Sequence, residues 1–168
     1  MNSIELKNLQ APLKEKYKTE PESAMITLKA SGEIGEGISC NIETSHALIE
    51  AGLHPATGGT GLLACSGDLL LQALVACAGV TLRAVATAIG VEIKNGVVKA
   101  EGDLDFRGTL GVSREAPVGF KTIRLEFNLD AVATSEQIES ISKLTERYCV
   151  VYQTLTKGVA VETKYHLQ

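Results

Sequence analysis

The longest apolar stretch of this sequence runs from Ser66 to Ile89 and reads SGDLLLQALVACAGVTLRAVATAI. It predicts one helix of about 35 Å, with Ser66 as its N-cap and Asp68 near the positive end of the helix dipole. Arg83 argues against a membrane span, because a charge near the bilayer centre costs at least ~2.5 kcal/mol. A helix that is apolar nearly all round has to be covered on most sides. We therefore expect the rest of the chain to fold around it.

The overall composition is that of one globular domain. The chain has 168 residues, of which 45% are hydrophobic and 21% charged, and this length is ample for a single core. Its net charge of −4 and the lack of a Lys/Arg block provide no surface typical of nucleic-acid or membrane binding. The N-terminus has no apolar segment typical of a secretory signal. We expect a cytoplasmic protein that binds neither nucleic acid nor a membrane.

Patterns on either side of the long helix predict the fold class. A capping box formed by Thr134 and Gln137 begins a second, amphipathic helix that ends at Gly158. Strands are expected over residues 24–30, 38–42, 97–106, 120–129 and 159–166. This order of strands, helix, strands, helix and strand predicts an α+β fold rather than alternating βαβ units.

The first 22 residues differ from the rest of the chain in their mixed, charged composition. Their apolar spacing predicts a short amphipathic helix that is interrupted by Pro12 and ends before Pro21. We expect residues 1–22 to form an N-terminal helical extension and residues 23–168 to form the main domain.

Several common site motifs are missing from the sequence. The segment His54–Gly61, HPATGGTG, lacks the Lys-Ser/Thr pair of a P-loop and predicts a loop or lid. The histidines His46, His54 and His166 are isolated from one another and from cysteines at ligand spacing, so no zinc site is indicated. A G-x-S-x-G nucleophile elbow is also absent. We expect no metal and no cofactor.

The four cysteines are Cys40, Cys65, Cys77 and Cys149, and their spacing fits no zinc pattern. Cys77 and Cys149 lie in the two predicted helices, which must pack together in a domain of this size. A buried thiol is usually an inert small hydrophobe unless a cation or helix terminus lowers its pKa. Arg83 lies roughly 120° around the helix from Cys77 and is not an obvious partner. Physical reasoning alone leaves both a packing role and a dithiol site open.

Two cysteine motifs resemble those of a known family. The segments DLLLQALVACAGVTL around Cys77 and RYCVVYQTL around Cys149, with strands between them, resemble the OsmC/Ohr family of osmotically induced and organic hydroperoxide resistance proteins. The resemblance covers most of the chain from about Met25 onward. It implies an OsmC-like fold, in which antiparallel sheets wrap around long central helices in an intertwined homodimer.

The resemblance also implies a thiol peroxidase that reduces organic hydroperoxides. Cys77 would attack the O–O bond as a thiolate and become a sulfenic acid, and Cys149 would then condense with it to form a disulfide. A dithiol reductant of the dihydrolipoyl type would restore the two thiols. A different class of function, a non-enzymatic small-ligand-binding or redox-sensing protein with an apolar pocket at the dimer interface, is the alternative.

The resemblance further implies charged residues that serve the thiolate. Family members with peroxidase chemistry carry an arginine in an early strand turn and a glutamate near the start of the helix. Here no arginine precedes Arg83, and Gly67 occupies the glutamate position, with Asp68 beside it. The candidates for tuning the thiolate are therefore Asp68, Lys29, Arg107 and Arg114.

Overall fold

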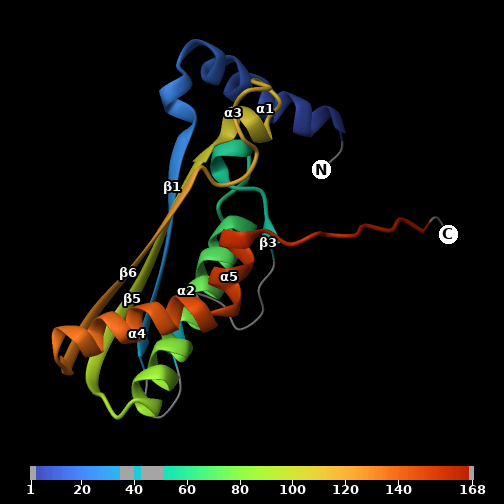
Figure 1. Cartoon of the computed structure of the whole chain (residues 1–168). Helices are drawn as coiled ribbons and strands as arrows, with labels where there is room; N and C mark the ends of the chain where they lie inside the picture. The colour runs from blue at the N-terminus through green and yellow to red at the C-terminus, as the bar shows by residue number, and fades with distance from the viewer. Residues whose placement is uncertain (1–2, 35–39, 43–50, 167–168) are drawn as a thin grey trace.

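The computed structural model describes residues 3–34, 40–42 and 51–166 and combines helices with antiparallel strands, which confirms the predicted α+β class (Figure 1). The α-helices are α1 (Ser3–Thr19), α2 (Ser66–Ala88), α3 (Phe106–Thr109), α4 (Ser135–Tyr148) and α5 (Val150–Lys157). The strands are β1 (Met25–Ile34), β2 (Cys40–Ile42), β3 (Ala51–Gly52), β4 (Ala64–Cys65), β5 (Glu92–Asp105) and β6 (Thr122–Val132). Two short 3-10 helices are η1 (Pro21–Ala24) and η2 (Pro55–Thr57).

One antiparallel sheet with the strand order β2-β1-β5-β6 forms the main layer, and β3 and β4 form a small parallel pair. The strands expected over residues 24–30 and 38–42 correspond to β1 and β2, which pair antiparallel over residues 32–34 and 40–42. The expected strand over residues 97–106 is part of β5, which begins earlier at Glu92 and contains an irregularity between Ile93 and Asn95. In β6 the alternation is regular, because each half-buried residue is followed by an exposed one.

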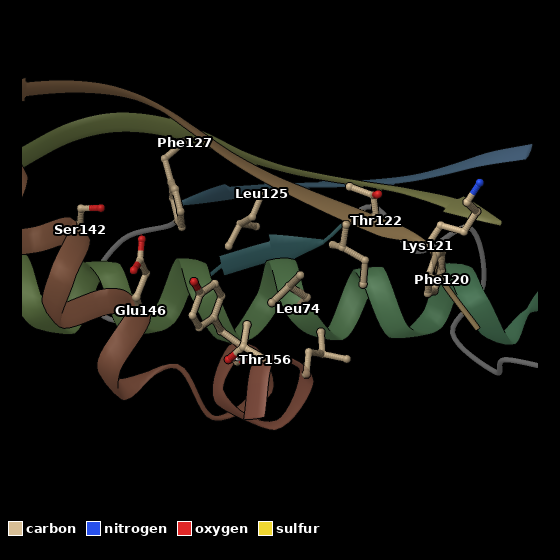
Figure 2. Close-up of a pocket in the computed structure, with 12 residues that line it drawn as sticks. Leu74, Phe120, Lys121, Thr122, Leu125, Phe127, Ser142, Glu146 and Thr156 are labelled. Carbon is tan, nitrogen blue, oxygen red and sulfur yellow. Dashed lines mark hydrogen bonds between the residues drawn. The ribbon is translucent and has the colours of Figure 1, made fainter. Parts of the chain in front are cut away.

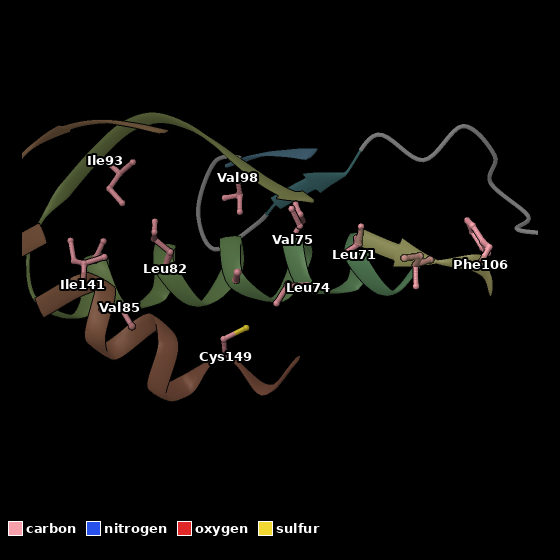
Figure 3. Packing of buried hydrophobic residues seen from close by; sticks show 14 of the residues in the cluster. Leu71, Leu74, Val75, Leu82, Val85, Ile93, Val98, Phe106, Ile141 and Cys149 are labelled. Atoms are coloured by element: carbon pink, nitrogen blue, oxygen red, sulfur yellow. The ribbon is translucent and has the colours of Figure 1, made fainter. Parts of the chain in front are cut away.

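Helix α2 lies against the inner face of this sheet and supplies much of the core (Figure 3). Leu71, Val75 and Leu82 of α2 are buried and pack in the same cluster as Val98 of β5. By length and composition, α2 is the one helix among the described residues that meets the criteria for a membrane span. Its burial against the sheet and against α4 and α5 identifies it as a core helix.

The two ends of α2 differ in how well the sequence predicted them. Gly90 has φ 71° and follows the C-cap residue, in agreement with the expected end of the helix. The predicted N-cap was wrong by one residue. Ser66 already belongs to the helix, and Cys65 is the N-cap, with a side chain that accepts no capping hydrogen bond.

The second predicted helix is two helices, α4 and α5, that meet at Cys149. The capping box of Thr134 and Gln137 is confirmed at the start of α4. Cys149 has extended geometry, with ψ 107°, and its sulfur accepts a hydrogen bond from the N–H of Tyr152 at 3.5 Å as the N-cap of α5. The β-branched residues Val150 and Val151 that follow also disfavour an unbroken helix. The single-helix prediction was therefore wrong at the cysteine itself.

The predicted last strand, residues 159–166, was also wrong. This segment is extended and exposed, and no described strand pairs with it (Figure 1). Its alternating apolar residues, Val159, Val161 and Tyr165, are 66%, 78% and 92% exposed. The period-two pattern thus describes a strand-like segment that has no partner edge within the described part of this chain.

Helix α1 runs through Pro12 without interruption, contrary to the sequence prediction. Its contacts with the rest of the chain favour the continuous helix. The hydroxyl of Tyr17, a buried residue, donates to the carbonyl oxygen of Ala56 at 2.6 Å. The amide of Gln10 donates to the carbonyl oxygen of Thr57 at 3.2 Å. These bonds tie the N-terminal segment to the loop that contains HPATGGTG.

Candidate functional site

The fold brings Cys77 and Cys149 together, although they are 72 positions apart in the sequence. Cys77 lies in the middle of α2, and Cys149 lies at the break between α4 and α5, both of which pack against α2. Figure 3 shows the sulfur of Cys149 directed toward α2. Both cysteines are free thiols in this structure, and the thiol of Cys149 donates a hydrogen bond to the sulfur of Cys77.

The surroundings of Cys77 lower the pKa of its thiol. Partial burial raises this pKa, but hydrogen bonds to the sulfur outweigh that effect. The donors are the N–H of Val151, the thiol of Cys149, the hydroxyl of Thr81 and the N–H of Val150. Two of these donors are at the start of α5, where backbone N–H groups have no partner within the helix. The thiolate of Cys77 is thus stabilised mainly by neutral donors.

The pKa of the Cys149 thiol is shifted in the opposite direction, upward. Its side chain is buried, with 1% of its surface exposed, and this burial raises the pKa of the Cys149 thiol to about 11. The neighbouring Cys77 contributes to this increase, because its thiolate favours the protonated form of Cys149 as a hydrogen-bond donor. The pair therefore consists of one thiol that ionises more readily than an ordinary cysteine and one that keeps its proton at neutral pH.

The charged residues predicted to tune the thiolate lie in different places. Arg107 forms a salt bridge with Asp105 at the end of the domain where α2 begins. Its Nη2 and Nε donate to Oδ2 of Asp105 at 2.5 Å and 3.1 Å. Arg114 is exposed in the connection between α3 and β6. The structure describes only the backbone of Lys29, in β1 opposite Glu101. Asp68 is in the first turn of α2, nine residues or about 13 Å before Cys77.

Cys77 lies at the border of a face of α2 that the described part of the chain leaves exposed. Leu70, Ala73 and Val80 of that face are exposed. Cys77 follows Leu70 by seven residues and Ala73 by four, and it precedes Val80 by three, which are spacings of residues on one helix face. Cys77 itself is partly exposed. The attacking sulfur predicted from the sequence is therefore next to an apolar surface that is open in the single chain.

A groove of about 550 Å³ lies beside the thiol pair, between β6 and the helices α4 and α5 (Figure 2). Its apolar wall includes Leu74, which is one turn before Cys77, and Tyr152, which is one turn after Cys149. Leu125 and Phe127 of β6 face it from the sheet. Figure 2 shows the side chains of Leu125 and Phe127 pointing from the sheet into the space between the sheet and the helices. Neither cysteine is part of the groove wall, and the wall also contains charged and hydroxyl-bearing residues, so the groove can receive a molecule that has an apolar part.

Sequence reasoning missed the neutral donors around Cys77. Thr81 is four residues after Cys77, so its position on the same helix face was a readable signal. The N–H groups of Val150 and Val151 could not be found in this way, because they depend on the break between α4 and α5.

These observations define a class: an α+β protein in which two free thiols from different helices meet, and in which residues one turn from each thiol line a groove of mixed polarity. The sequence model of the OsmC-like protein family matches residues 59–164, and the chain belongs to this family. The recognition made from the two cysteine motifs is thereby confirmed, although residues 1–58, including α1, lie outside the match.

Solved structures with the same fold support this assignment. An OsmC-like hydroperoxide resistance protein from Jannaschia sp. CCS1 is similar with a TM-score of 0.58 and 16% identity, over 86% of this chain and 94% of that one. An OsmC-like protein from Mycoplasma pneumoniae has a TM-score of 0.55 and 17% identity, over 80% of this chain and 86% of that one. At these identities the similarity shows the fold alone. None of the curated proteins matches this chain.

Proposed function

We propose that this protein is a thiol peroxidase that reduces organic hydroperoxides through Cys77 and Cys149. The observation that carries the proposal is the difference between the two contacting thiols. Hydrogen-bond donors around Cys77 lower the pKa of its thiol, whereas burial raises that of Cys149 to about 11. A peroxidatic cysteine must be a thiolate to attack, and a resolving cysteine must wait as a thiol until a sulfenic acid forms.

The proposed reaction has two steps on the protein. The Cys77 thiolate attacks the terminal oxygen of the hydroperoxide, the O–O bond breaks, and the alkoxide leaves and takes up a proton to become an alcohol. Cys77 is oxidised to a sulfenic acid and the peroxide is reduced. The Cys149 sulfur then attacks the Cys77 sulfur, an S–S bond forms, and the hydroxyl group leaves as water. A dithiol of the dihydrolipoyl type would reduce the disulfide and restore both thiols.

The groove beside the thiols supports an organic rather than an inorganic substrate. Leu74 and Leu125 form part of its wall, and Cys77 follows Leu74 by one turn of α2. An alkyl or aryl group buried there gains about 25 cal/mol for each Å² of apolar surface removed from water. Hydrogen peroxide has no such group. We therefore expect a preference for cumene hydroperoxide over hydrogen peroxide.

A homodimer in the cytoplasm is part of the same proposal. The open face of α2, with Leu70, Ala73 and Val80, is apolar and adjacent to Cys77. The extended segment 159–166 has alternating apolar residues and no strand partner in the described chain. A second copy that covers both features would bury this apolar surface.

The competing function is a binding protein whose cysteines serve only in packing. It is favoured by one observation: the main causes of the lowered pKa of Cys77 are neutral donors, whereas Arg107 is engaged by Asp105. Titration of free thiols before and after one equivalent of cumene hydroperoxide separates the two functions. The peroxidase loses two thiols per chain within the reaction, and a dithiol restores them. A binding protein keeps all its thiols under conditions that leave a free cysteine peptide largely unreacted.

A further inference from the structure

Helix α4 carries a buried hydroxyl group that the reaction described above does not use. The side chain of Thr145 is 3% exposed, and its Oγ1 has no hydrogen-bond partner among the described residues. The other buried polar residues in that part of the chain, Thr57 and Asp105, both have hydrogen-bond partners. A buried hydroxyl without a partner destabilises the folded state, so its presence at Thr145 needs an explanation.

Thr145 lies one helical turn before the proposed resolving cysteine, on the same buried face. Ile141, Thr145 and Cys149 follow one another at intervals of four residues, and each is at most 3% exposed. Ile141 and Cys149 belong to the same core cluster as the buried residues of α2 (Figure 3). Since α4 packs against α2, the face that these three residues share is the face toward α2.

The helix is regular from Thr145 to the backbone N–H of Cys149. This N–H donates to the carbonyl oxygen of Thr145 at 2.9 Å, and the φ of Cys149 is −72°. The Cβ atoms of residues four apart in a regular helix are about 5–6 Å from each other. One of these Cβ atoms carries Oγ1 and the other carries Sγ, so rotation of the side chains can bring the hydroxyl and the thiol into contact.

The neighbours of the Cys149 sulfur show why it needs a further acceptor. In the reduced protein its thiol donates to the sulfur of Cys77, so the S–H hydrogen points at the atom that Cys149 later attacks. The attack requires a lone pair of the Cys149 sulfur in that direction, and the hydrogen must then find another partner. The N–H groups of Tyr152 and Val151, which also bond to this sulfur, are donors and cannot accept it.

We propose that Thr145 is a positioning residue for the formation of the disulfide, an inference that rests on the proposed peroxidase function. When Cys77 has become a sulfenic acid, the S–H of Cys149 turns to the oxygen of Thr145, and a lone pair of the Cys149 sulfur faces Cys77. The S–S bond forms, the S–O bond of the sulfenic acid breaks, and the proton of Cys149 leaves with the hydroxyl group as water. Thr145 takes no part in the first attack on the peroxide.

A disulfide reagent tests this role without any peroxide. In a background with Cys40→Ser and Cys65→Ser, the Cys77 thiolate attacks dithiobisnitrobenzoate, releases one thionitrobenzoate and keeps the other in a mixed disulfide. Cys149 then attacks the Cys77 sulfur and releases the second thionitrobenzoate. Thr145→Val keeps the shape of the side chain but removes the hydroxyl. We expect an unchanged first release and a second release that is about three- to tenfold slower, since one hydrogen bond to Cys149 is lost.

Two further variants separate positioning from packing. Thr145→Ser restores the hydroxyl and should recover most of the rate of the second release. Thr154→Val is the matched control, because the exposed Thr154 bonds to the carbonyl oxygen of Val150, and both releases should keep their wild-type rates. The Thr145→Val protein should be no less stable to urea than the wild type, since the reduced protein loses no hydrogen bond. Equal rates of second release in the Thr145→Val protein and the wild type would overturn the proposal.

One equivalent of cumene hydroperoxide distinguishes this inference from the peroxidase proposal. If both are correct, the Thr145→Val protein accumulates Cys77 sulfenic acid that dimedone traps, while the wild type forms the disulfide. A wild-type protein that does not react with the peroxide, although its second thionitrobenzoate release depends on the Thr145 hydroxyl, would contradict the peroxidase alone. A Thr145→Val protein that forms the disulfide from the peroxide as fast as the wild type would contradict the role of Thr145 alone.

Discussion

The thiol of Cys149 donates a hydrogen bond to the sulfur of Cys77, so the buried thiol stabilises the ionised form of its neighbour. This contact exists because α4 ends and α5 begins at Cys149. The same break turns the N–H groups of Val150 and Val151 toward Cys77. One irregularity in the backbone thus assembles most of the donors around the proposed nucleophile.

The hydroxyl of Thr81 should contribute measurably to the reactivity of Cys77. Thr81→Val removes one donor to the thiolate, and the alkylation of Cys77 at pH 7 should become about three- to tenfold slower, since one hydrogen bond contributes about 0.5–1.5 kcal/mol. Thr87→Val, on the same helix but bonded to the carbonyl oxygen of Arg83, is the control and should leave the rate unchanged. Equal rates for the Thr81→Val protein and the wild type would remove Thr81 from the site.

The two thiols should respond to pH over separate ranges. Because the pKa of Cys77 is below the ordinary value for cysteine, its thiolate persists to lower pH than that of an ordinary cysteine and is lost as the pH falls through that pKa. Cys149, with a pKa of about 11, should be alkylated only in strongly alkaline solution. Alkylation of the two cysteine peptides between pH 5 and 10 tests this order. Faster modification of Cys149 than of Cys77 at pH 7 would reverse the assigned roles.

Arg107 should affect stability rather than thiol chemistry. Its guanidinium pairs with Asp105, whose side chain is only 1% exposed, and this lowers the pKa of Asp105. Arg107→Ala leaves that carboxylate without its guanidinium partner and should lower the free energy of unfolding at pH 7. The loss should shrink as the pH falls through the lowered pKa of Asp105, because the carboxylate then becomes neutral.

Urea unfolding at pH 7 and at pH 3 measures the effect of Arg107→Ala. Arg114→Ala, an exposed loop change, should be nearly neutral at both values. If Arg107→Ala instead slowed the alkylation of Cys77 and left stability unchanged, Arg107 would be acting on the thiolate, as one of the sequence-based candidates for that role.

Much of the fold was predictable because its strongest signals are local. The apolar run of α2, the capping box at Thr134 and the alternation in β6 each depend on neighbouring residues, and each is confirmed apart from small shifts in the ends. The break at Cys149 was not predictable, because periodicity continues across it while the cysteine sulfur caps the new helix. The strand predicted over residues 159–166 was wrong for a different reason. A strand needs a neighbouring strand to pair with, and the alternating pattern does not show whether one is available.

The open face of α2 should be a dimer interface. We expect sedimentation velocity at low micromolar concentration to show a dimer. Val80→Arg places a charge in the middle of this apolar face and should produce a monomer or a much weaker dimer. Ser140→Arg, on the exposed side of α4, is the matched control and should remain dimeric. A wild-type protein that sediments as a folded monomer at this concentration would contradict the dimer.

The proposal that Cys77 attacks the peroxide and Cys149 resolves the sulfenic acid is most directly tested by intact-mass measurement. The two single variants are measured after treatment with one equivalent of cumene hydroperoxide. In the Cys149→Ser protein Cys77 keeps its other donors, so it should react once and gain one oxygen as a sulfenic acid or a further oxidised form. In the Cys77→Ser protein the remaining Cys149 is still buried, which raises the pKa of its thiol, and it should gain none. Oxygen on the Cys77→Ser protein alone would assign the nucleophile to Cys149. No oxygen on either variant, under conditions that oxidise a free thiol, would contradict the peroxidase account.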